Sequence, residues 1–386
     1  MVGTAEWVMV GLLPNLSADL RLPLPAVGSL VTWYALTVTV AGPLVSLLML
    51  RVARRKALLA LVTVFVAGNV MAALAGGFAM LVAARMIIAL THSTSFALAL
   101  VIGVSMAPAM YRGRAIAVVA AGWNLATVFG APLGTWIGDH YGWRATFWGI
   151  AVLSALILAA VAVLIRPPQP DTPPHLHSEV RALLDRQVVT VLAIIIAAQA
   201  GLFTVYTYIT PLLGEVSGFA SPAVTMLLAV FGFGALAGNI LGGRLADRAP
   251  WGSLCALLAV LVAVLAVFAI TSHVRWAAAA TVLVLGVITA ALIPLLQERA
   301  LVAAPAAPTL VTAISASAFN LGVAGGSKIG GEVLSTGFGL SDLAWIGALV
   351  ALIALPPAAH AAFLHRRAGL LVRIADRDPS PSRTTC

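Results

Sequence analysis

The sequence has few charged residues. Only 9% of its 386 residues are Asp, Glu, Lys or Arg, whereas a water-soluble globular domain carries roughly 25%. A larger core cannot explain this deficit, because the surface of a soluble protein still needs polar groups. The lack of charge therefore excludes an ordinary soluble domain. Together with 61% hydrophobic residues, it predicts a protein that crosses the membrane many times.

Cysteine and lysine are also scarce. Cys255 lies in an apolar run and Cys386 is the last residue, so no disulfide framework is indicated. Lys56 and Lys328 are the two lysines among 22 basic residues, so the formal charge of +9 comes from arginine. The arginines lie mostly in short loops between apolar runs. This arrangement argues against a basic surface that binds nucleic acid.

The apolar runs predict helices. Their lengths suit membrane-spanning helices of about 20 residues rather than the ten-residue strands of a β-barrel. We expect an all-α membrane protein with twelve spans, at about 1–16, 28–50, 57–77, 79–106, 115–137, 145–165, 187–212, 222–246, 253–272, 276–297, 309–335 and 342–364. The first span is expected to be clipped at its start, because 20 residues counted back from Pro14 pass the first residue.

The longest polar segment, 167–186, divides the chain into two sets of six spans. We predict one six-helix bundle in 1–166, a linker in 167–186, a second bundle in 187–364 and a basic tail in 365–386. "LLMLRVARRK" after the second span and "GGRLADRAP" after the eighth span echo each other. Parallel repeats of this kind build transporters, so two pseudo-symmetric bundles are expected.

The basic residues predict the orientation of the chain. Most of them fall in the loops on the side of the linker and the tail, and three fall in the loops on the other side: Arg21, Arg144 and Arg275. Cytoplasmic loops of membrane proteins carry the excess of Lys and Arg. Both termini are therefore expected in the cytoplasm.

Glu6 is a carboxyl group in an apolar run, "GTAEWVMVGLLPNL". It lies about 12 Å from Pro14 at the rise of an α-helix, which places it near the middle of the membrane. Desolvation disfavours the charged form of a carboxyl group, and a group that exchanges a proton near neutral pH can carry a coupled proton. Glu6 could also pair with a cationic substrate, or stay neutral and hydrogen-bonded between helices.

Three further charged residues lie inside spans. Arg85 is deep in the fourth span, and a deep arginine usually faces a partner or a cavity. Lys328 and Glu332 are four residues apart in the eleventh span, so they share a helix face. An internal ion pair near the outer end of that helix is expected for these two, with a second coupling site as the alternative.

Polar and aromatic residues that interrupt the apolar runs are candidates for the lining of a substrate cavity. Aromatic side chains suit amphiphilic substrates through stacking and cation–π contacts. The alternative for each is a simple hydrogen bond or packing contact with the next helix. The candidates are Tyr34, Asn124, Gln199, Tyr206, Tyr208, Phe319 and Asn320.

Motifs of nucleotide-binding and hydrolytic enzymes are missing. "GFGALAG" at 232–238 resembles a dinucleotide fingerprint, but it follows no strand and has the wrong spacing. Close helix packing is the better interpretation. The sequence contains no GxxxxGK[ST], HExxH or GxSxG motif. We expect no cofactor and no metal, and transport driven by a proton gradient rather than by ATP.

Five segments together resemble the major facilitator superfamily: "GTAEWVMVGLLPNL", "VTWYALTVTVAGPL", "GAPLGTWIGDHYGWRATF", "GNILGGRLADR" and "FNLGVAGG". The resemblance covers nearly the whole chain. It is strongest to bacterial drug:proton antiporters related to arabinose-efflux permeases, sugar-efflux transporters and chloramphenicol-resistance exporters. It implies two six-helix bundles around a central cavity that opens alternately to each side of the membrane.

The resemblance also implies roles for single residues. "GAPLG" is similar to the antiporter motif of the fifth helix, which gives Gly130, Pro132 and Gly134 a role in conformational change. "GGRLADR" is similar to the cytoplasmic loop motif, in which Asp247 and Arg248 bond to a neighbouring helix end and hold that side closed. Glu6 and Arg85 match the acidic and basic residues linked to proton coupling.

These observations predict a proton-coupled exporter of a small organic solute or drug in the cytoplasmic (inner) membrane. Its expected partners are the substrate, protons and the lipid bilayer, and the protein is expected to be monomeric. One alternative is a proton-coupled importer or a uniporter of sugar or nucleoside. A second alternative is a membrane-embedded sensor or enzyme, although no nucleophile, metal cluster or signalling domain is visible. The sequence does not identify the substrate.

Overall fold

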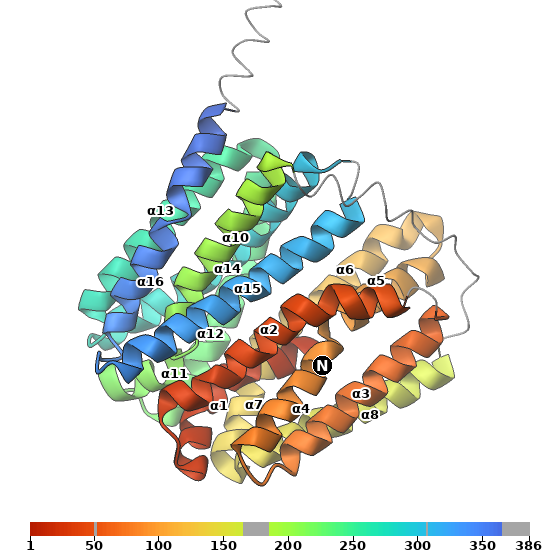
Figure 1. Ribbon diagram of the computed structural model, residues 1–386, viewed down its shortest axis with the longest axis horizontal. Helices are drawn as coiled ribbons and strands as arrows, with labels where there is room; N and C mark the ends of the chain where they lie inside the picture. Colours follow the sequence, from red (N-terminus) through yellow and green to blue (C-terminus); the bar gives the residue numbers. More distant parts are fainter. Residues whose placement is uncertain (50–51, 165–184, 306–307, 365–386) are drawn as a thin grey trace, which may run out of the picture.

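The computed structural model describes residues 1–49, 52–164, 185–305 and 308–364. The predicted linker 167–186, except for its last two residues, and the predicted tail 365–386 lie outside the described residues. All regular elements in the described part are helical (Figure 1). They are α1 (Val2–Leu20), α2 (Leu24–Met49), α3 (Arg54–Ala73), α4 (Phe78–Leu90), α5 (His92–Met106), η1 (Ala109–Tyr111), α6 (Arg112–Leu125), η2 (Ala126–Gly130), α7 (Ala131–Tyr141), α8 (Trp143–Leu164), α10 (Arg186–Tyr206), α11 (Ile209–Pro211), η3 (Leu212–Val216), α12 (Ser221–Arg248), α13 (Pro250–Thr271), α14 (Arg275–Ala303), α15 (Pro308–Ser335) and α16 (Asp342–Leu352).

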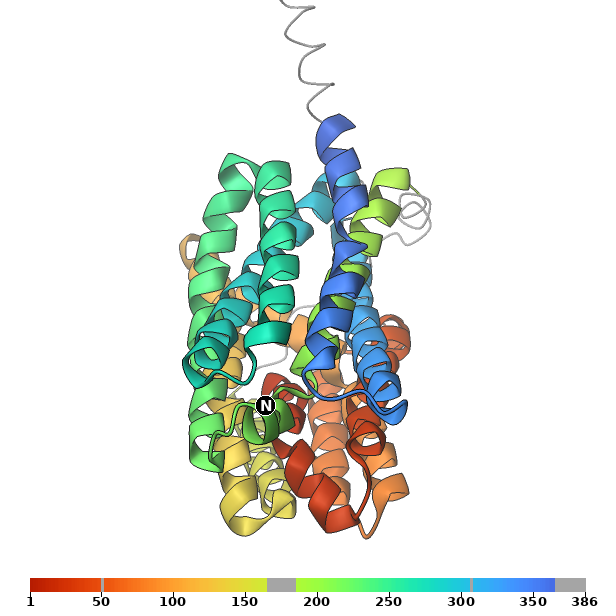
Figure 2. The same ribbon diagram turned by 90° about the vertical axis from the view of Figure 1, so that its left-hand side faces the viewer.

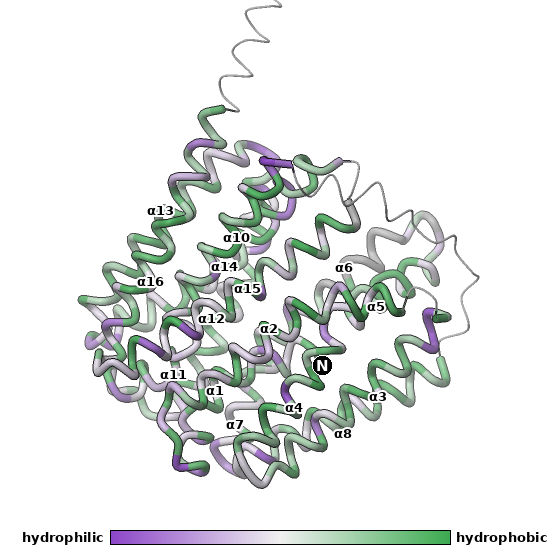
Figure 3. The backbone as a smooth tube through the Cα atoms, viewed as in Figure 1, coloured by the Kyte–Doolittle hydropathy of each residue, from purple (hydrophilic) through white to green (hydrophobic). Residues whose placement is uncertain are grey.

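Ten helical stretches in the described part of the chain are long and apolar enough to cross a membrane. The predicted all-α membrane class is confirmed. Helix α1 and the run from α6 to α7 are not among these ten, so the predicted number of twelve spans stays a prediction. Figure 3 shows hydrophobic residues along most of the helical length and many of the hydrophilic ones near the helix ends, as expected for helices in lipid.

The helices form two groups along the chain. In the N-terminal half (α1 to α8), α3 packs against α4 and α8, α2 against α4, and α1 against α7. In the C-terminal half (α10 to α16), α12 packs against α14, α10 against α15 and α16, and α13 against α16. Figures 1 and 2 show the red-to-yellow half beside the green-to-blue half, with the first residue in the interior of the molecule.

The helix ends define two ends of the molecule. The linker end is where α8 ends at Leu164 and α10 begins at Arg186; the far end is where α1 ends at Leu20 and α2 begins at Leu24. The turn between α1 and α2 is tight because Arg21 adopts the left-handed conformation, with φ 53°. Its N–H donates to Ser17 O, which satisfies a free carbonyl at the helix end.

Small residues allow α12 and α14 to pack with their backbones in contact. A Cβ atom added to Gly234 would lie 2.5 Å from Leu283 O. A Cβ atom on Gly238 would overlap Val287 O, and one on Gly242 would overlap Ala291 O. Glycines four residues apart therefore face one helix, as in other membrane helix pairs. The packing interpretation of "GFGALAG" agrees with this geometry.

The two halves touch along two seams. Helix α2 packs against α15, and α12 packs against η2 and α7. In the first seam, Ser327 Oγ donates to Gly28 O at 3.1 Å, and Thr39 Oγ1 lies 3.3 Å from Ser317 O. These contacts run from the middle of α2 and α15 to the far end. They hold the halves together there.

Asp139 closes the second seam at the far end. This residue of α7 accepts a hydrogen bond from Asn15 Nδ2 of α1 at 2.9 Å and another from Ser221 Oγ of α12. One carboxylate therefore links both halves. Sequence reasoning missed Asp139, because it follows just after the predicted span 115–137, where a carboxylate is usually only a solvated residue.

Candidate functional site

Glu6 lies in α1 with its side chain 12% exposed. Its Oε2 atom lies 3.9 Å from His92 Nε2. The same oxygen is buried and has no hydrogen-bond partner among the residues that the structure describes. An unsatisfied carboxyl oxygen in a buried position is costly, so it marks a place where a proton or a ligand group can bind.

Arg85 lies beside the same turn of α1. It belongs to α4 and is buried, with 1% of its surface exposed. Its Nη1 donates to Ala5 O at 2.5 Å, and its guanidinium carbon lies 4.1 Å from the centre of the Tyr34 ring. In the described part of the chain its Nε atom has no hydrogen-bond partner. The cation–π contact and the carbonyl bond thus hold a buried positive charge one residue from Glu6.

His92 completes this cluster and was missed by sequence reasoning. It is the first residue of α5, and Thr91 separates α4 from α5 within the predicted fourth span. His92 Nδ1 and the Tyr34 hydroxyl lie 2.8 Å apart and share a hydrogen bond. The signal was the polar run "THSTS" at 91–95. A histidine in a span can be a core residue, and only the structure places it beside Glu6.

These four side chains combine a carboxyl group, a guanidinium group, an imidazole and a phenol. We call Glu6, Tyr34, Arg85 and His92 the polar cluster. Arg85 carries a positive charge at physiological pH, which can balance a negative Glu6. His92 has nitrogens facing both Glu6 and Tyr34, and histidine is suited to pass a proton between two partners. The arrangement can hold, release and move one proton inside an apolar protein.

An aromatic group adjoins the polar cluster on the side of the C-terminal half. Trp7, the neighbour of Glu6, has its ring centre 5.6 Å from that of Tyr206 and 5.8 Å from that of Phe203. Tyr206 also packs on Phe231 with ring centres 4.3 Å apart. Phe319 of α15 reaches Phe203 at 6.3 Å. The predicted cavity residue Tyr206 therefore meets Trp7 of α1 between the two halves, and Phe319 joins the group through Phe203.

Gln199 and Asn320 lie on two packed helices, α10 and α15. Both side chains are buried. Asn320 Nδ2 donates to Ala316 O at 3.1 Å, but the side-chain oxygens of Gln199 and Asn320 have no partner within the described ranges. These free acceptors are the kind of group that a ligand with N–H or O–H donors can use.

The structure separates Tyr208 and Asn124 from these contacts. Tyr208 lies in the seam between α2 and α15, where its ring packs against Gly28 and Gly330 and its hydroxyl donates to Ser327 O at 3.4 Å. This position suits contact between the halves. Asn124 is partly exposed on α6 beside Trp123, whose ring lies 5.5 Å from that of His92.

Gly130, Pro132 and Gly134 lie where α1 packs on η2 and α7. A Cβ atom on Gly130 would overlap Thr4, and one on Gly134 would overlap Val8. Pro132 has no N–H to continue the α-helical ladder, and just before it Ala131 N–H bonds to Ala126 O, five residues back. Such π-turns often occur at functional sites. Helix α1, which carries Glu6, thus packs closely against the π-turn η2 and the start of α7.

Asp247 and Arg248 lie at the end of α12, at the linker end of the molecule. Both side chains are exposed. Within the described residues, neither makes a hydrogen bond or an ion pair. Their predicted bonds to a neighbouring helix end are absent from that part of the chain in this conformation, and their role in holding one side closed stays a prediction.

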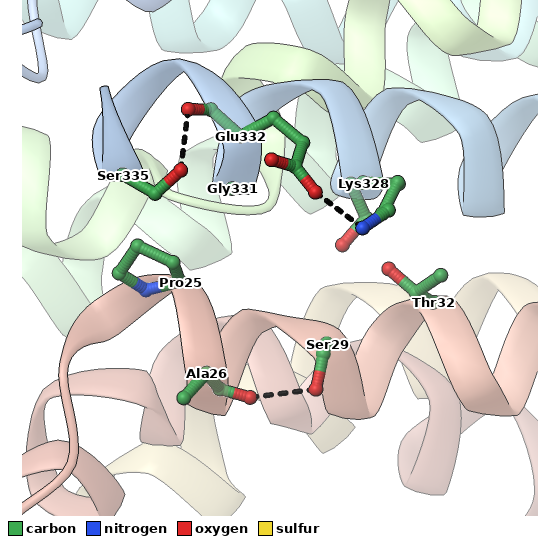
Figure 4. A pocket seen from close by; sticks show the side chains of 9 residues that line it. Pro25, Ala26, Ser29, Thr32, Lys328, Gly331, Glu332 and Ser335 are labelled. Carbon is green, nitrogen blue, oxygen red and sulfur yellow. Dashed lines mark hydrogen bonds and ion pairs between the residues drawn. The ribbon is translucent and has the colours of Figure 1, made fainter.

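Lys328 and Glu332 form an ion pair along α15, in which Lys328 Nζ donates to Glu332 Oε1. The side chains are 65% and 61% exposed, so the pair is not internal. The rotation of α15 about its own axis explains this exposure. Ser327 faces the seam and is buried, whereas Lys328 and Glu332 lie on the neighbouring face, which borders an open groove beside α2 (Figure 4).

Comparison with known proteins gives one family. The model of the Major Facilitator Superfamily matches residues 1–327. The chain is 34% identical over 354 residues to the inner membrane transport protein YdhP of Escherichia coli K12, covering 92% of this chain and 91% of the relative. It is 31% identical to a probable sugar efflux transporter of Mannheimia succiniciproducens, covering 91% and 88%. It is also 31% identical to a chloramphenicol resistance protein of Streptomyces lividans, covering 92% and 91%.

Proposed function

This chain belongs to the Major Facilitator Superfamily, and on that premise we propose that it exports a small organic solute in exchange for protons. It is a multi-pass membrane transporter rather than an enzyme. We place it in the cytoplasmic membrane as twelve helices in two bundles, with the linker end and both termini in the cytoplasm. Asp247 and Arg248 would then lie at the cytoplasmic surface.

The observation that carries the proposal is the free carboxyl oxygen of Glu6 within reach of His92. Arg85 binds the carbonyl of Ala5, the residue before Glu6. Trp7, the residue after Glu6, packs against Tyr206 of the aromatic group. A proton on Glu6 removes the negative charge that faces Arg85. One carboxyl group can thus respond both to protons and to a ligand between the halves.

The seams support a conformation that is closed at the far end. Ser327 with Gly28 and Asp139 with Ser221 join the halves there, whereas Asp247 and Arg248 are exposed at the linker end. With the orientation that the basic residues predict, the substrate would enter from the cytoplasm. Export then requires that the far-end contacts break and that contacts at the linker end form.

The proposed cycle couples these two states to Glu6. Deprotonated Glu6 faces the substrate in the cytoplasm-open state and binds it, directly or through its neighbours. In the outward-open state a proton from outside reaches Glu6, weakens its hold on the substrate or on Arg85, and favours release. A ligand shifts such an equilibrium only by its different affinity for the two states. The proton and the substrate therefore have to compete at the polar cluster.

The aromatic group supports an amphiphilic organic substrate. In this conformation Trp7 and Tyr206 are buried against each other and against Phe231, so in our proposal the substrate replaces these ring contacts by stacking. The unpaired oxygens of Gln199 and Asn320 provide two acceptors on the side of the C-terminal half. Relatives are named for sugar efflux and for chloramphenicol resistance. We infer a compound that combines an apolar or ring-shaped part with hydroxyl or amide donors, which both named classes satisfy.

Proton release on substrate addition tests the proposal. Purified protein in detergent and weak buffer is mixed with phenicols, sugars or nucleosides, and the pH of the solution is followed. We expect binding of one class to release protons, because substrate and proton compete for Glu6. Binding without proton release would contradict antiport and favour the importer or uniporter alternative.

A variant of His92 tests the relay within the polar cluster. We expect His92→Gln to slow proton-coupled exchange by about 100-fold, the lower range of what a positioned acid–base group contributes. Exchange of substrate for substrate, which moves no net proton, should keep its rate. The measurement is both rates against pH in proteoliposomes. His273→Gln, at an exposed residue of the far end, is the control. An unchanged pH profile in His92→Gln would exclude the relay.

A further inference from the structure

Tyr34 of α2 contacts two other members of the polar cluster through different parts of one side chain. The centre of its ring lies 4.1 Å from the guanidinium carbon of Arg85, and its hydroxyl oxygen lies 2.8 Å from Nδ1 of His92. The residue is buried, with 2% of its surface exposed. It therefore connects a fixed cation with a group that can exchange a proton.

Arg85 and His92 can both reach Tyr34 because of their spacing. Arg85 belongs to α4 and His92 is the first residue of α5, with only Thr91 between the two helices. Seven residues make about two turns of a helix, so the two side chains lie on one face of this nearly continuous segment. Helix α2 packs against both α4 and α5, which brings Tyr34 within contact distance of both side chains.

The imidazole of His92 is held by aromatic rings on two sides. From centre to centre, the Tyr34 ring lies 5.8 Å from it and the Trp123 ring of α6 lies 5.5 Å from it, and both rings are nearly perpendicular to it. In this packing Nδ1 lies on the side of Tyr34. Nε2 lies on the side of Glu6, 3.9 Å from Oε2. Each nitrogen of His92 thus has one defined neighbour.

One neutral tautomer of His92 fits these neighbours better than the other. A neutral imidazole carries a hydrogen on one nitrogen and a lone pair on the other. With the hydrogen on Nδ1, the Tyr34 hydroxyl would have to accept it, and Tyr34 has no other partner for its own hydrogen among the described residues. The lone pair of Nε2 would then face the deprotonated carboxyl group of Glu6. With the hydrogen on Nε2, Tyr34 donates to Nδ1 and an N–H group faces that carboxylate.

Arg85 favours the same tautomer. A positive charge stabilises negative charge on a neighbouring group, so the guanidinium group over the ring makes the Tyr34 hydroxyl a better hydrogen-bond donor. The charged and titratable groups that face His92 come from α1 (Glu6), α2 (Tyr34) and α4 (Arg85). Helices α3 and α6 also pack against α5, but within the described ranges they add no charged partner to His92.

We propose that Tyr34 is a positioning residue for proton coupling: its hydroxyl donates to Nδ1 and so keeps the hydrogen of His92 on Nε2, facing Glu6. This hydrogen stabilises the deprotonated form of Glu6, which binds substrate in the proposed cycle. Tyr34 itself neither takes up nor releases a proton. The inference rests on the proposed function in one respect, because it assumes that the coupled proton binds to Glu6.

Tyr34→Phe tests this role, because it removes the hydroxyl and keeps the ring against which Arg85 packs. Without the hydrogen bond, His92 favours the deprotonated form of Glu6 less, so Glu6 keeps its proton to a higher pH. Substrate-induced proton release should then persist to a pH about one unit higher than in the wild type, which corresponds to one lost hydrogen bond. The maximal rate of exchange in proteoliposomes should change little.

Tyr141→Phe is the matched control. It removes the same hydroxyl group from an exposed tyrosine at the far end and should leave the pH dependence unchanged. An unmoved pH dependence in Tyr34→Phe, together with a wild-type thermal midpoint, would overturn the proposal. A fall in the exchange rate at every pH without a shift would mean that Tyr34 carries the proton itself, and it would overturn the positioning role as well.

Nitrogen NMR of the wild-type protein tests the tautomer without transport or substrate. The protein is labelled with ¹⁵N at Nδ1 of histidine, and the signal of His92 is identified by its absence from His92→Gln. At alkaline pH, where imidazoles are neutral, we expect the signal of a nitrogen without hydrogen. A signal from Nδ1–H would overturn the proposal. If substrate releases no proton from any variant or from the wild type, the proposed function fails, whereas the NMR signal still decides whether Tyr34 fixes this tautomer.

Discussion

Glu6→Gln is expected to abolish proton-driven export, with transport falling to the rate of liposomes without protein. Glutamine has nearly the same shape as glutamic acid and can still face His92, but it cannot take up or release a proton. The polar cluster would then keep a fixed charge, and Arg85 would have no titratable partner at this turn of α1. The measurement is substrate efflux driven by an imposed pH gradient in proteoliposomes of defined protein content.

The matched control is Glu215→Gln. Glu215 is an exposed carboxylate of η3, so its substitution removes the same chemical group away from the polar cluster. We expect normal export from this variant. Wild-type rates and wild-type pH dependence in Glu6→Gln would show that Glu6 is not the coupling group. If substrate addition released protons from both the wild type and Glu6→Gln, the released proton would have to come from another residue. That result would be compatible with antiport.

Gly238→Ala is expected to cause a large loss of stability from a single added methyl group. The new Cβ atom would overlap the carbonyl oxygen of Val287, which belongs to the backbone of α14 and cannot rotate away. Helices α12 and α14 would have to separate along their shared face. Overpacking of this kind costs about 1–3 kcal/mol or more. The thermal unfolding midpoint in detergent should fall clearly.

Gly243→Ala on the same helix should have the opposite effect. A Cβ atom there meets no atom of another element within 4 Å in the described part of the chain, so the substitution only removes the flexibility of glycine, which favours the helix by roughly 0.5–1 kcal/mol. Unfolding midpoints of the two variants are measured side by side. If Gly238→Ala were as stable as Gly243→Ala, the close packing of α12 on α14 would be wrong.

The physical class of this protein could be predicted from its sequence. A chain with 9% charged residues and long apolar runs has to be helical in lipid, because each backbone N–H and C=O must be satisfied within the membrane. The same reasoning identified Glu6 and Arg85, since charged groups are too costly in a span to be accidental. The spacing of Lys328 and Glu332 was likewise enough to predict that they share a helix face.

The tertiary structure decided which of these residues meet. Helical periodicity gives the face of each residue on its own helix but not the rotation and tilt of one helix against another, which depend on side-chain packing across the whole bundle. For that reason the sequence did not connect His92 with Glu6, placed Tyr208 in a cavity rather than in a seam, and expected Lys328 and Glu332 inside the protein. The composition and the free-energy cost of burying charge identified the candidate functional residues in the sequence. Packing between helices far apart in the sequence determined which side chains each of them contacts.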